Sequence, residues 1–334
     1  MIKNQENFSA GIGNTPLIKL KAASEVTGCN IYGKAEFLNP GGSVKDRAAL
    51  ALIKDAQDKK LISKGGTVVE GTAGNTGIGL GLLGNSLGYK TIIVMNDNQT
   101  QEKKDILKNL GAELKLVPAK PFKDENNYVK VASRLADELR PNNNNGVIWA
   151  NQFDNTANAK GHYEGTGKEI WDQTDGKVDA FICSSGTGGT ISGVSNALKE
   201  KNKNIKIYLS DPKGSSLYNY IKHGELKSEG NSITEGIGSS RITKNFENAK
   251  IDDAFSIDDH EALPILYDLI KKEGLSLGTS CGINIAGAIR LGKELGPGKT
   301  IVTILCDKSD KYASKMFNKK FLDEKGLNYP DWIK

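Results

Sequence analysis

The sequence SSGTGGTIS, residues 184–192, decides how this chain is interpreted. The apolar run Val178–Cys183 precedes it and predicts a buried strand, whereas Gly193–Asn202 follows it with helical character. The order is therefore strand, glycine-rich turn, helix.

The side chains of this turn suit a bound anion. Glycine has no Cβ atom, so the backbone can adopt positive φ and approach a ligand closely. N–H groups at the start of the following helix, together with hydroxyls, favour a phosphate. The residues concerned are Gly186, Thr187, Gly188, Gly189 and Thr190. A tight turn without a ligand explains a lone glycine run equally well, so the phosphate interpretation depends on further motifs.

Length and composition are those of an ordinary globular protein of the size of many enzymes. A chain of 334 residues suggests about two domains. The 38 glycines gather in short clusters, which indicates ligand-binding loops built from backbone. The net charge of +5 is spread among interleaved acidic and basic residues, so we expect no nucleic-acid partner. No signal peptide or run of about 20 apolar residues is present, so we expect a cytoplasmic protein without a membrane segment.

The cysteines and histidines predict neither disulfides nor a metal site. The four cysteines are scattered without a CxxC pair, and two of them end apolar runs, so buried reduced thiols are expected. The three histidines lie too far apart in sequence for a local metal motif.

Strand-like and helix-like segments alternate along nearly the whole chain. Apolar strand runs such as Thr91–Met95 and Ile301–Leu305 are separated by helical patterns such as Lys45–Lys59. This alternation predicts a doubly wound, mostly parallel α/β architecture. The asparagine-rich loop Pro141–Gly146 is the best candidate for a domain boundary.

The stretch Asn39–Arg47, NPGGSVKDR, places a lysine beside a glycine loop. A helix that begins at about Ser43 sets Lys45 in its first turn. Desolvation lowers the pKa of a lysine and frees its lone pair for Schiff-base chemistry. Lysine is abundant in this chain and usually solvated in a first turn, so composition alone does not select Lys45.

Two more strand-to-helix turns carry polar groups. Glu70–Gly79, EGTAGNTGIG, offers hydroxyls, an amide and N–H groups that suit a carboxylate, although a turn capped by Thr76 is the simpler alternative. Gly278–Ala288, GTSCGINIAGA, contains Ser280, whose hydroxyl suits either a ring nitrogen or an N-cap.

Together these motifs resemble the fold-type II pyridoxal-phosphate enzymes, most closely the cysteine synthase (O-acetylserine sulfhydrylase) family. The resemblance runs from GNTPL at Gly13–Leu17 to the segment Phe317–Leu322. It implies that Lys45 forms the Schiff base with pyridoxal 5′-phosphate and that GTGGT, residues 186–190, is the phosphate cup. It also implies that Ser280 faces the pyridine nitrogen.

The resemblance further implies a substrate site. TAGNT resembles the loop that binds the substrate carboxylate, and its residues are Thr72, Ala73, Gly74, Asn75 and Thr76. Asn75 would also meet the ring hydroxyl of the cofactor. Gln152 matches a glutamine that holds the carboxylate, and Gly236 lies in EGIG, which resembles a loop near the substrate amine. The family usually has serine at position 73, and Asn96–Lys104 lacks the usual proline and methionine, so the acyl donor stays open.

The implied reaction is β-replacement, in which O-acetyl-L-serine and sulfide give L-cysteine and acetate. A serine hydroxyl cannot keep the ring nitrogen protonated, which favours loss of a β-substituent over transamination. Lys45 would act as general base. A smaller mobile domain, 35–150, would carry the lysine and the carboxylate loop, and a larger domain, 10–34 plus 151–322, the phosphate cup. Family members are commonly homodimers, and some bind serine acetyltransferase.

Other functions stay open from the sequence alone. A cystathionine β-synthase or a cysteine desulfhydrase would share the cofactor, and a homologue without activity would share the fold. A nicotinamide-dependent oxidoreductase is suggested by GLGLLG at Gly79–Gly84, with Asp97 after the next strand. These glycines fall inside a predicted helix rather than in its preceding turn, which favours a packing role.

Overall fold

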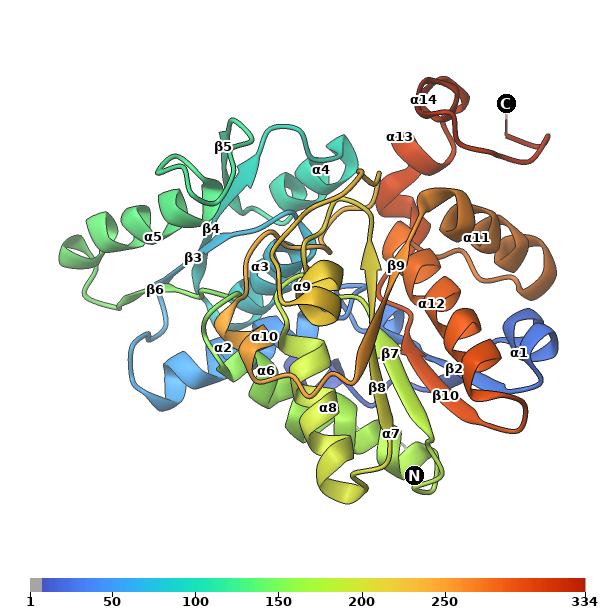
Figure 1. The fold of residues 1–334 in the computed structure, drawn as a ribbon. Helices are drawn as coiled ribbons and strands as arrows, with labels where there is room; N and C mark the ends of the chain where they lie inside the picture. Colours follow the sequence, from blue (N-terminus) through green and yellow to red (C-terminus); the bar gives the residue numbers. More distant parts are fainter. Residues whose placement is uncertain (1–7, 334) are drawn as a thin grey trace.

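The computed structural model describes residues 8–333, and their strands form two separate sheets (Figure 1). The larger sheet has the order β1-β2-β10-β7-β8-β9, in which only β1 and β2 pair antiparallel. Its strands are β1 (Leu17–Lys19), β2 (Asn30–Lys34), β7 (Ala180–Cys183), β8 (Lys206–Pro212), β9 (Asp253–Ile257) and β10 (Thr300–Ile304). The smaller sheet is parallel throughout, in the order β5-β4-β3-β6. Its strands are β3 (Thr67–Gly71), β4 (Lys90–Asn96), β5 (Glu113–Val117) and β6 (Val147–Trp149).

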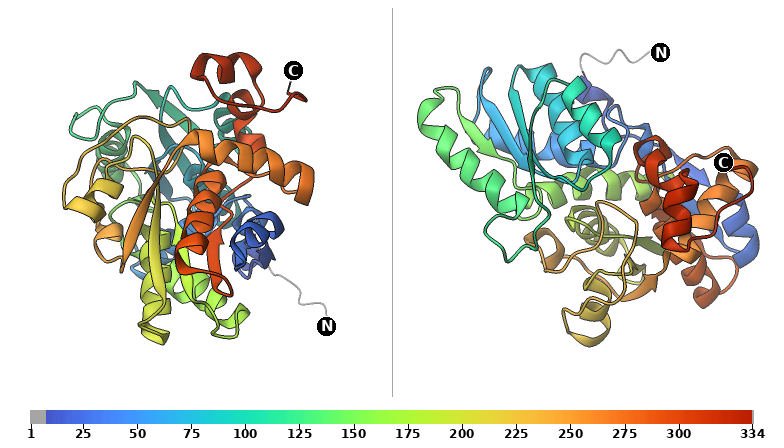
Figure 2. Two further views of the ribbon diagram at one scale, coloured as in Figure 1. Left: turned by 45° about the vertical axis from the view of Figure 1, so that its right-hand side comes forward. Right: turned by 90° about the horizontal axis from the view of Figure 1, so that it is seen from above.

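Helices cover both faces of each sheet, which confirms the doubly wound α/β class (Figure 2). They are α1 (Lys21–Thr27), α2 (Lys45–Asp58), α3 (Asn75–Leu87), α4 (Gln101–Asn109), α5 (Tyr128–Leu139), α6 (Ala157–His162), α7 (Lys168–Gln173), α8 (Gly189–Lys201), α9 (Leu217–His223), α10 (Lys244–Glu247), α11 (Asp259–Glu273), α12 (Thr279–Leu295), α13 (Ala313–Met316) and α14 (Lys319–Lys325). Short 3₁₀ turns lie at Phe8–Gly11, Glu36–Leu38, Arg140–Asn142 and Ser309–Tyr312, and a π-helical turn spans Tyr163–Gly167.

Alternating burial along the strands explains this layering. In β4, Ile92 and Val94 pack against α5, whereas Ile93 and Met95 point to the opposite face and pack against residues of α3 and α4. Successive side chains of a strand point to opposite faces, so a strand that is covered on both sides must be apolar throughout. The largest apolar core lies in the six-stranded sheet and includes residues of β7, β8, β10, α8 and α12.

The helices that follow two of the proposed ligand turns begin earlier than the sequence suggested. Thr76 was the predicted N-cap of α3, but the helix begins at Asn75 with Gly74 as its cap, so that prediction is wrong. Gly74 has φ +139°, a conformation that favours glycine, and this allows the chain to turn sharply into the helix two residues early. Likewise α12 is capped by Gly278 and not by Ser280. Both hydroxyl side chains are therefore free of the capping role.

Segments distant in sequence meet where the two sheets approach each other. Helices α2, α6 and α8 pack on one another between the sheets. The C-terminal segment, with the turn Ser309–Tyr312 and α13, packs against α4 of the smaller sheet (Figures 1 and 2). The carboxyl ends of β3 and β7 open into the same region, which is where ligands bind in parallel α/β folds.

Candidate active site

Two adjoining cavities lie between the carboxyl ends of β3 and β7. The larger has a volume of about 210 Å³ and the smaller about 20 Å³. Both are lined by Lys45, Gly186, Thr187, Ile237 and Cys306. The four motifs singled out in the sequence therefore converge on one site, although they are separated by up to 235 residues along the chain.

The structure places almost every predicted site residue on a wall of these cavities. The larger cavity is lined by Lys45, Thr72, Ala73, Gly74, Asn75, Thr76, Gln152, Gly186, Thr187, Gly236 and Ser280. Gly188 and Thr190 line the smaller one. Gly189 lines neither; it begins α8, and a Cβ atom there would collide with the side chain of Asn158. The roles assigned to these residues stay predictions.

The turn before α8 has a backbone that only glycine tolerates. Gly188 has φ +87°, and a Cβ atom at this position would lie 2.5 Å from the backbone nitrogen of Phe246. The turn is held to its surroundings because the N–H of Ser184 donates to Asn284 Oδ1 at 2.7 Å. Helix α8 then begins at Gly189, whose N–H donates to Thr187 Oγ1 at 3.3 Å, and Gly188 and Thr190 beside it line the smaller cavity. The start of a helix favours an anion.

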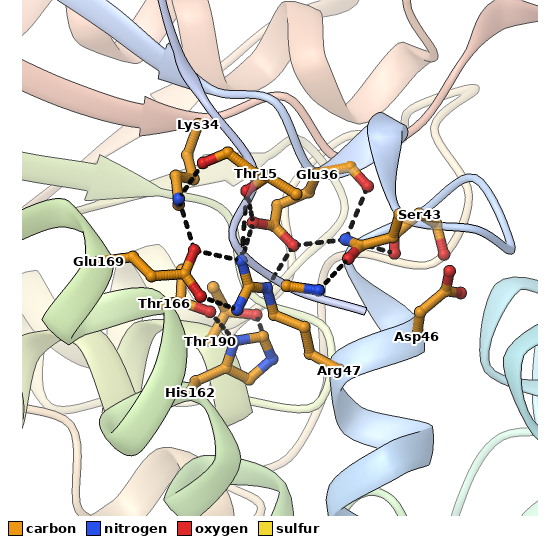
Figure 3. A network of polar contacts seen from close by, with 12 residues as sticks. Thr15, Lys34, Glu36, Ser43, Asp46, Arg47, His162, Thr166, Glu169 and Thr190 are labelled. Carbon is orange, nitrogen blue, oxygen red and sulfur yellow. Dashed lines mark hydrogen bonds and ion pairs between the residues drawn. The ribbon is translucent and has the colours of Figure 1, made fainter. Parts of the chain in front are cut away.

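A buried histidine positions Thr190 beneath this turn (Figure 3). His162 Nε2 lies 3.2 Å from Thr190 Oγ1, and its Nδ1 lies 2.8 Å from Thr166 Oγ1. Burial, with smaller contributions from the positive charges of Arg47 and Lys45, lowers the pKa of His162 to about 3. The imidazole is therefore neutral and acts as a hydrogen-bonding support rather than as a charge.

An ion-pair network fixes the helix that carries Lys45 (Figure 3). Arg47, two residues further along α2, donates to Glu36 Oε2 at 2.7 Å and to both carboxylate oxygens of Glu169 at 2.7 Å. Lys34 Nζ lies 2.6 Å from Glu169 Oε2. The carboxyl group of Glu36 is fully buried and also accepts from Thr15 Oγ1 at 2.7 Å. These bonds tie the start of α2 to β2 of the larger sheet and to α7.

Acid should weaken this network through Glu169. Burial alone would raise the pKa of this carboxyl, but its bonds with Arg47 and Lys34 outweigh burial and lower it from 4.5 to about 2. A depressed carboxyl pKa contributes stability that is complete above pH 4.5 and lost as the pH falls toward 2. We expect Glu169→Gln to destabilise the protein at pH 7 and this difference to shrink progressively between pH 4.5 and pH 2. Urea unfolding of the wild type and of Glu169→Gln at several pH values in this range measures the difference in their free energies of unfolding. A difference that does not change with pH would contradict this prediction.

The loop 72–76 lines the larger cavity and is held in place by its own side chains and by Gln152. Thr72 Oγ1 accepts from the N–H of Gly74 at 3.1 Å. Thr76 Oγ1 donates to Gln152 Oε1 at 2.5 Å, and Gln152 Nε2 donates to the carbonyl of Gly71 at 3.0 Å. Gln152 is therefore bound to both ends of this loop, and its role in holding a carboxylate stays a prediction. Asn75 and Thr76 at the start of α3 also line this cavity, and the start of a helix favours a carboxylate.

Asn75 and Ser280 both line the larger cavity. Asn75 Nδ2 donates to Asp307 Oδ2 at 2.7 Å, and the same oxygen accepts from Tyr312 Oη at 2.6 Å. Among the bonds of the described residues, Asn75 Oδ1 has no partner although it is buried. Ser280, the second residue of α12, is buried as well and lines the cavity.

Sequence reasoning missed several residues that line the larger cavity: Lys103, Tyr128, Phe153, Glu235, Cys306 and Tyr312. Glu235 lies in the EGIG stretch, from which only Gly236 was selected. Lys103 is the clearest omission. It is only 1% exposed, and a lysine is rarely buried to this extent unless it is paired with a carboxylate. The only sign of Lys103 in the sequence is the lysine pair in QEKKDIL. Such pairs are common on exposed helices, so this one does not distinguish a buried lysine.

These residues fit pyridoxal phosphate. The site combines a lysine amine, the N-terminus of a 13-residue helix and a buried hydroxyl around one cavity. The buried Asn75 Oδ1, which has no partner among the described residues, is a feature that a ligand explains. Lys45 would hold the aldehyde carbon, the N–H groups of 186–190 the phosphate, Asn75 the ring hydroxyl and Ser280 the ring nitrogen.

Other classes of site find no support in residues 8–333. No group of three or more His, Cys, Asp or Glu side chains there is arranged to hold a metal ion. None of the helices described is long and apolar enough to cross a lipid bilayer. All four cysteines are buried free thiols, as predicted. The glycines of GLGLLG lie inside α3, as expected for a packing role rather than a dinucleotide turn.

Comparison with known proteins supports the same assignment. The family described as pyridoxal-phosphate dependent enzyme matches residues 8–307. The chain is 50% identical to cysteine synthase 1 of Emericella nidulans over 325 residues, and 48% identical to cysteine synthase 1 of Neurospora crassa over 327 residues. Each alignment covers 96% of this chain and 86% of the relative.

A solved structure extends the comparison to three dimensions. The hydrogen sulfide-producing enzyme from Fusobacterium nucleatum superposes with a TM-score of 0.82 at 34% identity, covering 92% of this chain and 100% of that one. Fold, cavity and sequence similarity agree. The chain therefore belongs to the pyridoxal-phosphate dependent enzymes, within the fold-type II group that includes the cysteine synthases.

Proposed function

We propose that this enzyme makes L-cysteine and acetate from O-acetyl-L-serine and sulfide. The observation that carries the proposal is a pair of adjoining cavities that share the Lys45 wall, the larger lined by the 72–76 loop and the smaller by the N-terminus of α8. An amine, an anion site and a carboxylate site are the three groups that an amino-acid substrate and a phosphorylated aldehyde require together. Full-length similarity to cysteine synthases selects β-replacement from the reactions open to this cofactor.

Some residues of the site bind and orient the substrate, and Lys45 transfers a proton. Bound pyridoxal phosphate supplies the electron sink that makes the α-proton of an amino acid acidic. Lys45 Nζ takes that proton as general base and returns it when the product is complete. Thr72, Asn75 and Gln152 orient the substrate carboxylate, and the rings of Tyr128 and Phe153 exclude water from the reacting carbon atoms.

The decisive experiment is a product assay with paired substrates. Purified enzyme loaded with pyridoxal phosphate should release cysteine from O-acetyl-L-serine and sulfide. Serine with homocysteine tests a cystathionine β-synthase, and cysteine alone, with detection of released sulfide, tests a desulfhydrase. If either of these runs faster than cysteine synthesis at saturating substrate, the proposed reaction is wrong.

We also propose a division into a smaller mobile domain, 35–150, and a larger domain, 10–34 plus 151–322. The sheets support it, because β3 to β6 belong to one and β1, β2 and β7 to β10 to the other. Movement of the smaller domain would carry the 72–76 loop toward the phosphate cup and close the cavity. Small-angle scattering with and without substrate tests it.

Partners and compartment are proposed from the resemblance. A homodimer is testable by light scattering of the purified protein. Binding of serine acetyltransferase through its C-terminal tail is testable by titration of a tail peptide against O-acetyl-L-serine, with which it should compete. The buried free thiols suit a reducing compartment such as the cytoplasm, which fractionation of cells would test.

Gly188→Ala should weaken cofactor binding strongly. The new Cβ atom must occupy space 2.5 Å from the backbone nitrogen of Phe246 at a strained φ of +87°. The turn must shift, and a misplacement of about 1 Å at a binding group costs on the order of 100-fold. Gly224→Ala is the matched control, because Gly224 has φ +76° but nothing within 4 Å of its Cβ position. Titration of pyridoxal phosphate by visible absorbance should separate the two; equal affinities would contradict a role for this turn.

A further inference from the structure

Two charged side chains other than Lys45 face each other on the wall of the larger cavity. Lys103 of α4 and Glu235 of the loop between α9 and α10 both line it. Their Nζ and Oε2 atoms are 2.6 Å apart, and the side chains are 2% and 6% exposed. A pair this buried loses much of its solvation, so it is weak evidence for stability and calls for another explanation.

The stem of Lys103 supports the carboxylate loop. A Cβ atom on Gly74 would lie 2.6 Å from Lys103 Cδ and 3.2 Å from its Cγ, so the Gly74 backbone rests directly on this side chain. The positive φ of Gly74 directs the loop into α3 at this point. The position of Lys103 therefore bears directly on the position of the 72–76 loop.

The segment that carries Glu235 is bound to the phosphate turn. The N–H of Gly238 donates to the carbonyl of Ser185 at 2.8 Å. The carbonyl of Gly236 packs so closely on Gly186 that a side chain on Gly186 would collide with it. Glu235 is thus fixed to one half of the site, while Lys103 is fixed to the other.

A second cation completes the cluster without touching the loop. Lys315 Nζ of α13 lies 2.6 Å from the other carboxylate oxygen, Glu235 Oε1. Lys315 does not line the cavity. The ring of Tyr312 lies 4.3 Å from Lys103 Nζ and favours the ammonium form. The two lysines therefore share one carboxylate, but only Lys103 contacts Gly74.

We propose that Lys103 and Glu235 form a positioning pair that fixes the carboxylate loop to the phosphate turn and so sets the affinity for the amino-acid carboxylate. The inference rests on the proposed function in one respect, that the 72–76 loop binds this carboxylate. Neither side chain takes part in bond making. A loop held in place before binding spares the substrate the cost of ordering it.

Three conservative variants test the pair. Lys103→Met keeps the length of the stem and removes the charge. Lys315→Met removes a cation from the same carboxylate without disturbing Gly74, and is the matched control. Glu235→Gln keeps the shape of the partner but not its charge. Each is loaded with pyridoxal phosphate and titrated with L-alanine, which has the carboxylate and amine but no leaving group, by the change in visible absorbance of the cofactor.

Lys103→Met should weaken L-alanine binding and raise the KM for O-acetyl-L-serine by about tenfold, within the range typical of coupled sites. Its kcat should stay within about twofold of the wild type, because Lys45 on α2 is untouched. Lys315→Met should bind L-alanine within about twofold of wild type. An equal loss in the two lysine variants would overturn the inference, since it would show that any cation on Glu235 serves.

Glu235→Gln separates positioning from simple electrostatic attraction. It leaves the cavity more positive, so attraction alone predicts tighter binding of the carboxylate. Positioning predicts weaker binding, by about threefold or more, because Lys103 loses its charged anchor. Tighter binding would overturn the inference. This variant also serves if Lys103→Met does not fold, which thermal unfolding of each variant would reveal.

The L-alanine titration measures binding alone and does not require that the enzyme carries out the proposed reaction. If the enzyme makes no cysteine from O-acetyl-L-serine, but Lys103→Met still weakens L-alanine binding, the positioning pair is upheld and the proposed reaction fails. If all variants bind L-alanine equally while cysteine is made, the reaction stands and the positioning pair is wrong.

Discussion

Lys45→Ala should abolish cysteine synthesis, with a fall in rate of at least about 10³-fold, because one side chain provides both the covalent attachment and the general base. The variant should keep its fold, since the Lys45 side chain forms no ion pair in the described part of the chain and alanine suits the first turn of α2. Pyridoxal phosphate should still bind through the phosphate turn, but without covalent attachment.

Borohydride reduction followed by mass spectrometry measures the attachment directly. The wild type should gain one cofactor mass on the peptide that contains Lys45, and the variant should gain none. Lys54→Ala, an exposed lysine on the same helix, is the control and should behave as wild type. A labelled peptide in Lys45→Ala, or activity close to wild type, would reject Lys45 as the attachment residue.

The sequence predicted the polar turns well because each is a local feature. A glycine-rich run between a strand and a helix specifies its own backbone, so 186–190 and 72–76 were recognisable before any contact was known. The start of α3 was misplaced at Thr76 because Gly74, with φ +139°, ends the loop earlier than a hydroxyl cap would. Capping rules rank residues by the hydrogen bonds that their side chains can make to the start of a helix. Gly74 begins the helix through its backbone conformation and makes no such side-chain bond.

Residues that reach the site from other elements left no local signal. Lys103 looks like a surface lysine of an amphipathic helix, and only the approach of the EGIG loop and the C-terminal segment buries it. Tyr312 lies 237 residues beyond Asn75, yet both bond to Asp307. Such groups depend on how the two sheets pack together, which strand and helix periodicity does not encode.

Arg47→Met should be the most destabilising substitution in the network around α2. The change leaves the Glu36 carboxyl at 0% exposure without its cation, and the remaining bonds from Thr15 and Asn39 are neutral. Removing one partner of a buried pair costs about 3–5 kcal/mol, because the other charge stays buried and unpaired. Burial opposes the charge on Arg47, but Glu36 and Glu169 outweigh it and raise the pKa of the guanidinium, so the arginine stays charged.

Urea unfolding of the cofactor-loaded protein, followed by tryptophan fluorescence, measures the loss. Arg134→Met is the control: Arg134 is 46% exposed and 3.6 Å from Glu125, so the change should cost no more than about 1 kcal/mol. Adding Glu36→Gln to Arg47→Met should recover part of the loss, since a neutral amide is less costly to bury than an unpaired carboxylate. If the double variant is as unstable as the single one, packing of the arginine stem rather than the orphaned charge accounts for the loss.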